Sequence, residues 1–173
     1  MDFRLGIVGC AGTGKSVLGE LLSARLSVPF LPAKQITGDI LRRDNYDYAS
    51  GIQVEKFLSS SARQREILQR TKEQQSVESF VTDRTSIDLA SYAILEMEGA
   101  LDVKRHLEMC EDMIEVYTHL LFCPWMGQEI VGNQKRTLDP WYQFTVHSVE
   151  LEVAEYFGIC MYTFNSCDVN ERV

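Results

Sequence analysis

The stretch Gly9-Cys10-Ala11-Gly12-Thr13-Gly14-Lys15-Ser16 decides the fold of this chain. It lies between the apolar run Leu5-Gly6-Ile7-Val8 and a helix-like run that begins at Val17. The pattern GxxxxGK[ST] between a strand and a helix is the signature of a phosphate-binding loop. Its glycines let several backbone N–H groups point at one phosphate, and the following helix adds the positive end of its dipole. We therefore predict that residues 9–16, the phosphate loop, bind a nucleotide.

The motif also predicts roles for single residues of the phosphate loop. Lys15 is expected to reach the outer phosphates of a nucleoside triphosphate, and the Ser16 hydroxyl is expected to hold Mg²⁺. ATP and Mg²⁺ are therefore the expected cofactors. Cys10 is either an oxidation-sensitive thiol or an inert loop residue. The predicted nucleotide-binding residues are Gly9, Ala11, Gly12, Thr13, Gly14, Lys15, Ser16 and Val17.

The length and composition indicate one soluble globular domain. A chain of 173 residues can bury a sizeable core. Hydrophobic residues make up 45% of the chain and charged residues 24%, which are ordinary values for such a domain. No apolar run approaches the ~20 residues that a membrane span needs, and the N-terminus lacks a signal-peptide pattern. We therefore expect no membrane partner.

The net charge bears on nucleic-acid binding, and the cysteines bear on the redox state of the compartment. A net charge of −8 disfavours nonspecific attraction to nucleic acid, although a local basic groove is compatible with it. No CxxC pair occurs, so a metal site or a disulfide framework is not expected. Reduced thiols of a cytoplasmic protein fit better. The five cysteines are Cys10, Cys110, Cys123, Cys160 and Cys167.

Strand-like and helix-like runs alternate along the chain without a repeat or a linker. This alternation predicts an α/β fold with a parallel sheet covered by helices on both faces. The pattern alone does not predict the strand order. The five predicted strands are residues 3–8, 28–31, 79–82, 116–123 and 159–164. The helices between them include residues 38–43, 54–74 and 103–114, and one that ends near Gly158.

Two short segments of the sequence predict where a helix begins. Thr85-Ser86-Ile87-Asp88 has the [ST]xx[DE] form of a capping box. Asp139-Pro140 combines an N-cap residue with proline at the first helical position. The first of these starts places Asp83 and Arg84 at the carboxyl end of a strand. In open α/β sheets that edge is where ligands bind.

The segment Thr82-Asp83-Arg84-Thr85 resembles the Asp-Arg motif that thymidylate kinases and deoxynucleoside kinases carry after their third strand. By that resemblance Asp83 would orient Mg²⁺ or its water, or take a proton. Arg84 would bridge the donor and acceptor phosphates. The alternative is that the two residues form an ion pair that caps the following helix.

Residues 125–138 form a polar, glycine-containing loop with Lys135 and Arg136. The loop resembles the lid of small nucleotide kinases, in which arginines close over ATP and spread the charge of the transition state. By this resemblance Arg136 is a catalytic residue. A surface cation without function is the alternative.

Taken together, these features resemble the P-loop nucleoside and nucleotide kinase group, including the kinase domain of NadR-type proteins. The likeness spans about residues 3–172. It implies one domain over residues 1–173 with strand order 2-3-1-4-5, an acceptor-binding segment near residues 32–75 and a lid near 125–138. The chain departs from the group at its end, where such folds usually complete another helix after Asn165. The residues that hold the adenine are therefore left open.

The acceptor is predicted from the segment after the second strand. Deoxynucleoside kinases place a Glu there, whereas this chain reads Leu31-Pro32-Ala33-Lys34-Gln35. A phosphate acceptor needs no general base but needs cations to hold it. We therefore favour a (deoxy)nucleoside monophosphate, although some of these cations could simply lie on the solvated face of a short helix. The predicted acceptor-binding residues are Lys34, Asp39, Arg42 and Arg43.

Two other functions stay open at this point. In the first, the acceptor is a hydroxyl on a nucleoside or on a modified base in DNA, with Asp39 or Asp83 as the base; the net charge disfavours DNA. In the second, the chain is a regulatory NTPase without a small-molecule acceptor. The sequence is also compatible with a homodimer.

Overall fold

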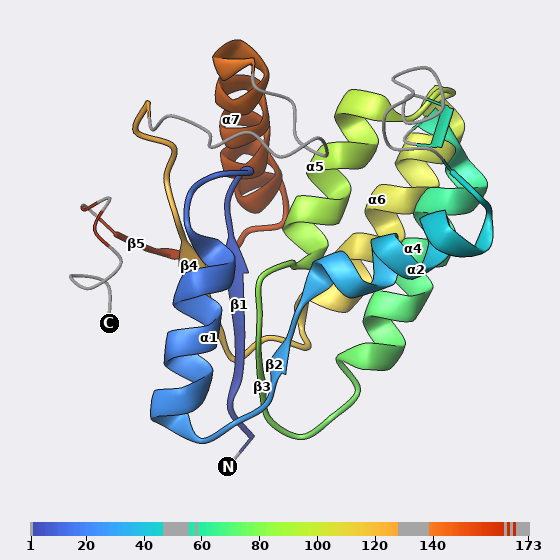
Figure 1. Ribbon diagram of the computed structural model, residues 1–173. Coiled ribbons are helices and arrows are strands. Elements are labelled where there is room, and N and C mark those ends of the chain that lie inside the picture. Colours follow the sequence, from blue (N-terminus) through green and yellow to red (C-terminus); the bar gives the residue numbers. More distant parts are fainter. Residues whose placement is uncertain are drawn as a thin grey trace.

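The computed structural model describes residues 2–46, 56–57, 59–127, 139–164, 166 and 168. They form a five-stranded sheet of order β2-β3-β1-β4-β5 (Figure 1), and all four strand pairs are parallel. The predicted α/β fold and the strand order implied by the kinase resemblance are therefore confirmed. The strands are β1 (Arg4–Val8), β2 (Phe30–Leu31), β3 (Phe80–Thr82), β4 (His119–Phe122) and β5 (Tyr162–Thr163).

Six helices lie within the described residues. They are α1 (Lys15–Leu26), α2 (Ala33–Arg43), α4 (Ser61–Gln74), α5 (Ser86–Glu96), α6 (Ala100–Ile114) and α7 (Pro140–Tyr156). Helix α2 begins at Ala33 and not at the predicted Gly38, because Pro32 is its N-cap and a distant side chain accepts a hydrogen bond from the Ala33 N–H. The predicted helix over residues 54–74 is interrupted at Ser60, which has an extended backbone. Of the predicted run before Ser60, residues 54, 55 and 58 lie outside the described residues.

Both local helix starts are confirmed. The Thr85 hydroxyl accepts a hydrogen bond from the Asp88 N–H, and the Asp88 carboxylate accepts one from the Thr85 N–H at 2.8 Å. At α7, the Asp139 carboxylate accepts a hydrogen bond from the Trp141 N–H at 2.9 Å, with Pro140 as the first helical residue. These caps satisfy backbone donors that the first helical turn leaves unpaired.

The sheet is covered on both faces. On one face α1 packs against the strands through a small apolar cluster that includes Leu5, Leu18 and Val81. On the other face a larger cluster joins the sheet to residues of α2, α4, α5, α6 and α7. Figure 1 shows α4, α5 and α6 gathered beside one another, and their packing contacts agree. The larger cluster therefore buries most of the core between the sheet and these helices.

The parallel arrangement brings three connections to one edge of the sheet. The phosphate loop follows β1, Pro32 follows β2, and Asp83 follows β3. Because β1 pairs with β3 and β3 pairs with β2, these connections are neighbours at the carboxyl edge. Across the described part of the chain, no helix has the length and apolar character that crossing a membrane requires.

Candidate functional site

The phosphate loop turns sharply between β1 and α1. Gly9, Gly12 and Gly14 have φ values of 146°, 88° and 85°, which residues with a Cβ rarely adopt. A Cβ atom on Gly9 would also lie 2.5 Å from the carbonyl oxygen of Cys123. The loop therefore depends on glycine, and it leads directly into the N-terminus of α1, where exposed N–H groups favour an anion.

Lys15 folds back over the loop that precedes it. Its ammonium donates hydrogen bonds to the carbonyl oxygens of Cys10, at 2.9 Å, and of Gly9. The Thr13 hydroxyl donates to the same Cys10 oxygen at 3.0 Å and is buried. Lys15 is thus held at the loop, in reach of any phosphate bound there. The other predicted loop residues, all at least partly accessible, are Ala11, Gly12, Gly14, Ser16 and Val17.

Asp83 joins the phosphate loop to the N-terminus of α2. Its Oδ2 atom accepts a hydrogen bond from the Ser16 hydroxyl, and its Oδ1 atom accepts one from the Ala33 N–H at 2.8 Å. The structure therefore brings together the two residues that were predicted to hold Mg²⁺, although they are far apart in sequence. The Asp83 side chain is buried in this position.

The Ser16–Asp83 pair fits the donor set of a nucleotide-bound Mg²⁺. Mg²⁺ prefers oxygen donors, and it usually combines one or two protein carboxylates with waters and substrate phosphates. Among the described residues, no group of three or more His, Cys, Asp or Glu side chains could hold a metal on its own. An ion at Ser16 and Asp83 would therefore take its remaining ligands from the nucleotide and from water.

Arg84 extends from the end of β3 toward α2. Its Nη1 atom donates to the Thr37 hydroxyl at 3.3 Å, and its guanidinium carbon lies 5.8 Å from the centroid of the Tyr92 ring. Thr37 belongs to α2 and Tyr92 belongs to α5. The cation therefore lies between these helices, next to the segment that was predicted to bind the acceptor.

Two buried carboxyl groups near the phosphate loop were not predicted as site residues. Asp88 in α5 is 2% exposed and Glu150 in α7 is 0% exposed. The only sequence signal for Glu150 was a charged residue at an otherwise apolar position of α7, four residues after Val146 and three before Val153, both of them buried. Asp88 was predicted only as a capping residue, and it does cap α5.

These two carboxyl groups interact with Lys15. Burial raises the pKa of Glu150 well above its ordinary value, the charge of Asp88 raises it further, and Lys15 opposes both effects. Burial also raises the pKa of Asp88, against the effect of Lys15 and of hydrogen bonds from Thr85. Thr85 donates to Asp88 from its N–H at 2.8 Å and its hydroxyl at 2.7 Å. Neither Glu150 oxygen has a hydrogen-bond partner among the described residues, so we assign the proton to Glu150 and the charge to Asp88.

Cys10 lies in the same electrostatic environment. Its side chain is buried, and burial is the main cause that raises the pKa of the thiol to about 12. A thiol with this pKa is protonated at neutral pH and reacts slowly with oxidants. Of the two interpretations of Cys10, the inert loop residue is therefore favoured.

The predicted acceptor-binding residues all lie on α2. Lys34 and Arg42 are exposed, and Arg42 forms an ion pair with Asp39 one turn before it. Arg43 points instead toward α4, where its Nη1 atom lies 2.6 Å from the carboxylate of Glu66. The four residues therefore share a helix but not a common direction.

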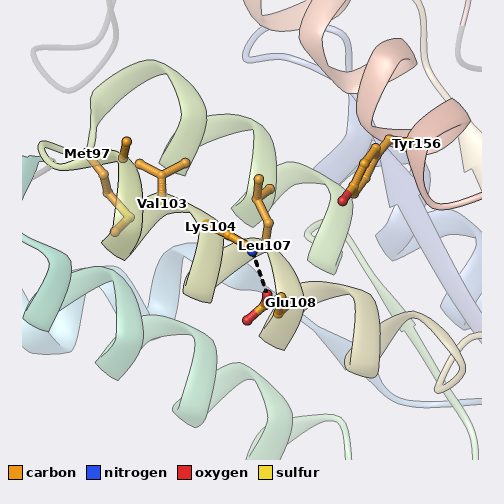
Figure 2. A pocket seen from close by; sticks show the side chains of 7 residues that line it. Met97, Val103, Lys104, Leu107, Glu108 and Tyr156 are labelled. Atoms are coloured by element: carbon orange, nitrogen blue, oxygen red, sulfur yellow. Dashed lines mark ion pairs between the residues drawn. The ribbon is translucent and has the colours of Figure 1, made fainter.

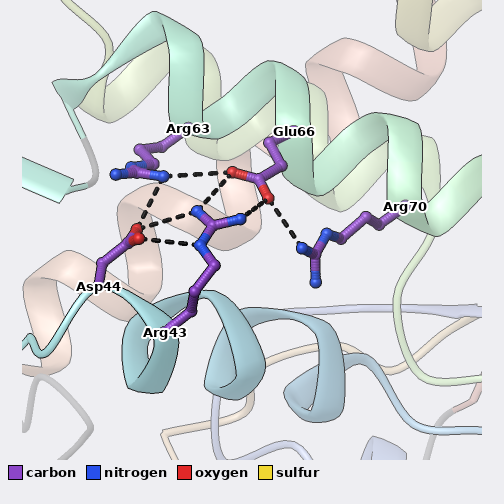
Figure 3. Close-up of polar contacts among 5 residues, drawn as sticks. All are labelled: Arg43, Asp44, Arg63, Glu66 and Arg70. Carbon is purple, nitrogen blue, oxygen red and sulfur yellow. Dashed lines mark hydrogen bonds and ion pairs between the residues drawn. The ribbon is translucent and has the colours of Figure 1, made fainter.

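Arg43 belongs to a charged network of five residues between α2 and α4 (Figure 3). Asp44 and Glu66 each contact two or more arginines at 2.6–3.2 Å. Hydrogen bonds from Arg43 are the largest cause of the lowered pKa of both carboxyl groups. The network ties the two helices together, and its members are Arg43, Asp44, Arg63, Glu66 and Arg70.

The predicted lid residues Lys135 and Arg136 lie outside the described residues, which resume at Asp139. Two aromatic residues that flank this region differ in their contacts. The Tyr142 hydroxyl donates a hydrogen bond to Glu96 and so ties the start of α7 to α5. Trp141, by contrast, is 74% exposed. Tyr142 therefore anchors α7 to α5, whereas the Trp141 side chain lies largely in solvent.

A cavity of about 330 Å³ lies elsewhere on the molecule (Figure 2). It contains none of the predicted site residues. Its one ion pair is the exposed contact between Lys104 and Glu108 at 3.9 Å, within α6. The lining residues are Met97, Ala100, Val103, Lys104, Leu107, Glu108 and Tyr156. The cavity is therefore separate from the phosphate-loop site.

Comparison with known proteins supports the fold. A protein-family model described as an AAA domain matches residues 4–172. No curated protein matches the chain. Among solved structures, the chain is similar to NadR protein in complex with NR, with a TM-score of 0.73 and 14% identity over 95% of this chain and 46% of that chain. The chain thus spans about half the length of this NadR structure.

Two further structures match over nearly their whole length. Deoxyadenosine kinase from M. mycoides has a TM-score of 0.65 and 15% identity, over 98% of this chain and 94% of that chain. Thymidylate kinase from Ehrlichia chaffeensis has a TM-score of 0.57 and 14% identity, over 98% and 96%. At these identities the likeness establishes the fold, which is the one found in P-loop nucleoside and nucleotide kinases.

Proposed function

We propose that this chain, which belongs to the AAA domain family, is a phosphotransferase that uses ATP and Mg²⁺. The observation that carries the proposal is the contact of Asp83 with Ser16 of the phosphate loop. It unites a predicted phosphate-binding loop with the one acidic residue of the Asp-Arg motif. The fold shared with nucleoside and nucleotide kinases supports the same function.

In the proposed reaction, each residue has a distinct task. The phosphate loop binds the ATP phosphates through its N–H groups, and Lys15 moves from the loop carbonyls to the outer phosphates. Ser16 and Asp83 would hold Mg²⁺, which supplies neutralisation of the phosphate charge when it is bound. Arg84 stabilises the charge that develops between the donor and the acceptor, and Arg136 would close over ATP from the lid.

The proposed acceptor is a (deoxy)nucleoside monophosphate. Arg84 contacts Thr37 of α2, so its positive charge lies beside the segment that we propose binds the acceptor phosphate. Lys34 and Arg42 add exposed positive charge on the same helix. Asp39 and Arg43 were also predicted to bind the acceptor, but Asp39 pairs with Arg42 and Arg43 is directed toward α4. A monophosphate oxygen is anionic and can attack without a general base.

A hydroxyl acceptor on a nucleoside is the second candidate. It is favoured by the position of Asp83, whose carboxylate lies between the phosphate loop and the start of α2 and could take a proton from such a hydroxyl. The likeness to deoxyadenosine kinase is compatible with this reaction. A modified base in DNA is a less favoured acceptor of the same kind, because the chain carries a net charge of −8.

We also propose that the chain acts in the cytoplasm on a small molecule. The four described cysteines Cys10, Cys110, Cys123 and Cys160 are free thiols, as is typical of a reducing compartment. A homodimer stays compatible with this proposal, and its presence can be tested by the molar mass in solution.

The test is an acceptor panel with γ-labelled ATP and Mg²⁺. Mononucleotides, nucleosides and DNA are offered separately, and transfer of the label is followed. Label on a mononucleotide supports the leading proposal. Label only on nucleosides or on DNA rejects it in favour of the second candidate. Release of phosphate that is the same with every acceptor would indicate a regulatory NTPase.

A further inference from the structure

The turn that carries Asp83 and Arg84 rests on a buried amide. Gln75, the C-cap residue of α4, is 1% exposed. Its Nε2 atom donates to the backbone carbonyl of Arg84 at 3.0 Å and to the Thr82 hydroxyl at 3.4 Å. The amide therefore contacts the residue on each side of Asp83, through the Thr82 hydroxyl and the Arg84 backbone carbonyl.

A tyrosine completes this support from the other side of the amide. The Tyr117 hydroxyl donates to Oε1 of Gln75 at 2.6 Å and accepts a hydrogen bond from the Ser86 N–H at 3.2 Å. Burial raises the pKa of Tyr117, so the hydroxyl stays a donor at neutral pH. The resulting bridge runs from Ser86 through Tyr117 and Gln75 to Arg84, and it brackets the Asp83-Arg84 turn.

The central strand leaves room for this bridge. A Cβ atom on Gly6 of β1 would lie 2.6 Å from Cγ2 of Thr85 and 3.1 Å from Cδ1 of Tyr117. The same Cβ atom would lie 2.8 Å from Cδ2 of Leu120, so a larger residue would crowd the Thr85, Leu120 and Tyr117 side chains together. The Thr82 hydroxyl also donates to the Leu31 carbonyl at 2.9 Å, so the supported turn is connected to the end of β2, where α2 begins.

We propose that Gln75 and Tyr117 are positioning residues that fix the Asp83-Arg84 turn for phosphoryl transfer. This inference rests on the proposed function. Both side chains act on the turn through their hydrogen bonds to residues 82, 84 and 86. Their removal would take away the Gln75 donor of the Arg84 carbonyl, which keeps only the 3.3 Å contact from the Thr82 hydroxyl, and the acceptor of the Ser86 N–H. The turn would shift to satisfy these groups. Small displacements of catalytic groups are costly for transfer.

The direct test compares Tyr117→Phe with Thr71→Val. Both variants remove one buried hydroxyl, and Thr71 lies on the same helix α4, where its hydroxyl donates only to the Ile67 carbonyl at 2.7 Å. We expect Tyr117→Phe to lower kcat about tenfold with KM for ATP changed less than about twofold. Thr71→Val should keep the wild-type kcat. A loss of kcat that is equal in both variants, or absent from both, overturns the proposal.

A double-mutant cycle separates positioning from a general structural effect. If Tyr117 acts through the turn, Tyr117→Phe should cost much less kcat in an Asp83→Asn background than in the wild-type background. Equal losses in the two backgrounds contradict the proposal. Gln75→Met, which keeps the shape but removes both ends of the amide, should behave like Tyr117→Phe.

A binding experiment decides the inference even if the wild-type protein transfers no phosphate. The affinity for ATP is measured with Mg²⁺ and again with a chelator. A bridge that positions Asp83 predicts that Tyr117→Phe lowers the gain in affinity that Mg²⁺ gives, by no more than about twofold, while Thr71→Val keeps the whole gain. A full gain in Tyr117→Phe rejects the bridge. Absence of transfer in the wild type, by contrast, rejects only the proposed function.

Discussion

The backbone N–H of Ala33 donates a hydrogen bond to Oδ1 of Asp83 at 2.8 Å. Asp83 thereby sits at the N-terminus of α2, where the helix dipole favours its negative charge. Its second oxygen accepts a hydrogen bond from Ser16. One carboxylate thus connects the segments that follow β1, β2 and β3. A change at Asp83 should therefore affect the alignment of donor and acceptor more than the binding of either one.

Asp83→Asn tests this expectation. The amide keeps an oxygen that can accept from Ala33, but it removes the charge that would hold Mg²⁺. We expect kcat to fall about 10²-fold while ATP affinity changes less than about threefold. Steady-state kinetics and a direct measurement of ATP binding give the two values. Equal losses in kcat and in ATP affinity would recast Asp83 as a structural residue.

Lys15→Ala should abolish phosphoryl transfer. The ammonium is the only side-chain cation of the phosphate loop, and a loop without it loses its contact with the outer phosphates. We expect transfer to fall at least about 10²-fold. Lys104→Ala is the matched control, because its side chain is 73% exposed and pairs only weakly with Glu108. Full activity of Lys15→Ala would mean that the loop does not bind the donor.

Substitutions on α2 should separate acceptor binding from helix packing. Lys34→Ala and Arg42→Ala should each raise KM for the acceptor about tenfold, the cost of one charge-assisted contact, with KM for ATP unchanged. Arg43→Ala should lower Tm instead, because Arg43 holds Asp44 and Glu66 in the network between α2 and α4. The comparison uses initial rates and thermal unfolding. A change in acceptor KM for Arg43→Ala alone would assign the acceptor site to the network.

The parts of the fold that depend on neighbouring residues could be predicted from the sequence. The phosphate loop, the capping box of Thr85 and Asp88, and the Asp139 cap are all read from short segments, and the structure contains each of them. Helix α2 was predicted to begin too late, because the acceptor for the Ala33 N–H is Asp83, which comes from another strand.

The same physical reason explains which site residues the sequence did not reveal. Glu150 lies on α7 among apolar positions, and its neighbours Asp88 and Lys15 come from other elements. No local sequence pattern distinguishes Gln75 or Tyr117. Their role becomes visible only in the fold, where Tyr117 donates to Gln75 and Gln75 donates to the Arg84 carbonyl. Local patterns predict which residues start a helix or bind a phosphate, whereas buried polar partners depend on the packing of distant segments.

Glu150→Gln should stabilise the protein at neutral pH. Burial and the charge of Asp88 raise the pKa of Glu150 in the native state. The native state therefore keeps a proton that the unfolded chain, in which Glu150 has its ordinary pKa of 4.5, releases as the pH rises above that value. Native stability therefore falls as pH rises through the raised native pKa. A neutral amide avoids this cost, and we expect a gain in free energy of unfolding of about 1 kcal/mol at pH 7.

The stability of Glu150→Gln is measured by denaturant unfolding between pH 4 and 8. Wild type and variant should converge at the acid end, where Glu150 is protonated in both states. Glu152→Gln on the exposed face of the same helix is the control and should change stability little. A Glu150→Gln variant that is less stable than wild type at pH 7 would mean that Glu150 is ionised and paired.

His106 should make the protein sensitive to mild acid. Its side chain in α6 is 1% exposed. Burial, and then the charge of Arg65, lowers the pKa of His106 from 6.5 to about 4. Between pH 4 and 6.5 the unfolded chain binds a proton at His106 that the native state does not bind. The contribution of the neutral His106 to the free energy of unfolding is therefore fully present above pH 6.5 and is lost as pH falls toward 4. The full difference amounts to about 3 kcal/mol.

The contribution of His106 can be isolated with His106→Leu. Glu150 has an opposite pH dependence in part of the same range, so the quantity to measure is the difference in free energy of unfolding between variant and wild type at each pH. As pH falls from 6.5 to 4, the wild type should lose free energy of unfolding relative to His106→Leu, because its unfolded chain gains a proton at His106 that its native state does not. Above pH 6.5 the difference should stay constant. A constant difference for His106→Leu across the whole range would show that the imidazole titrates alike in both states.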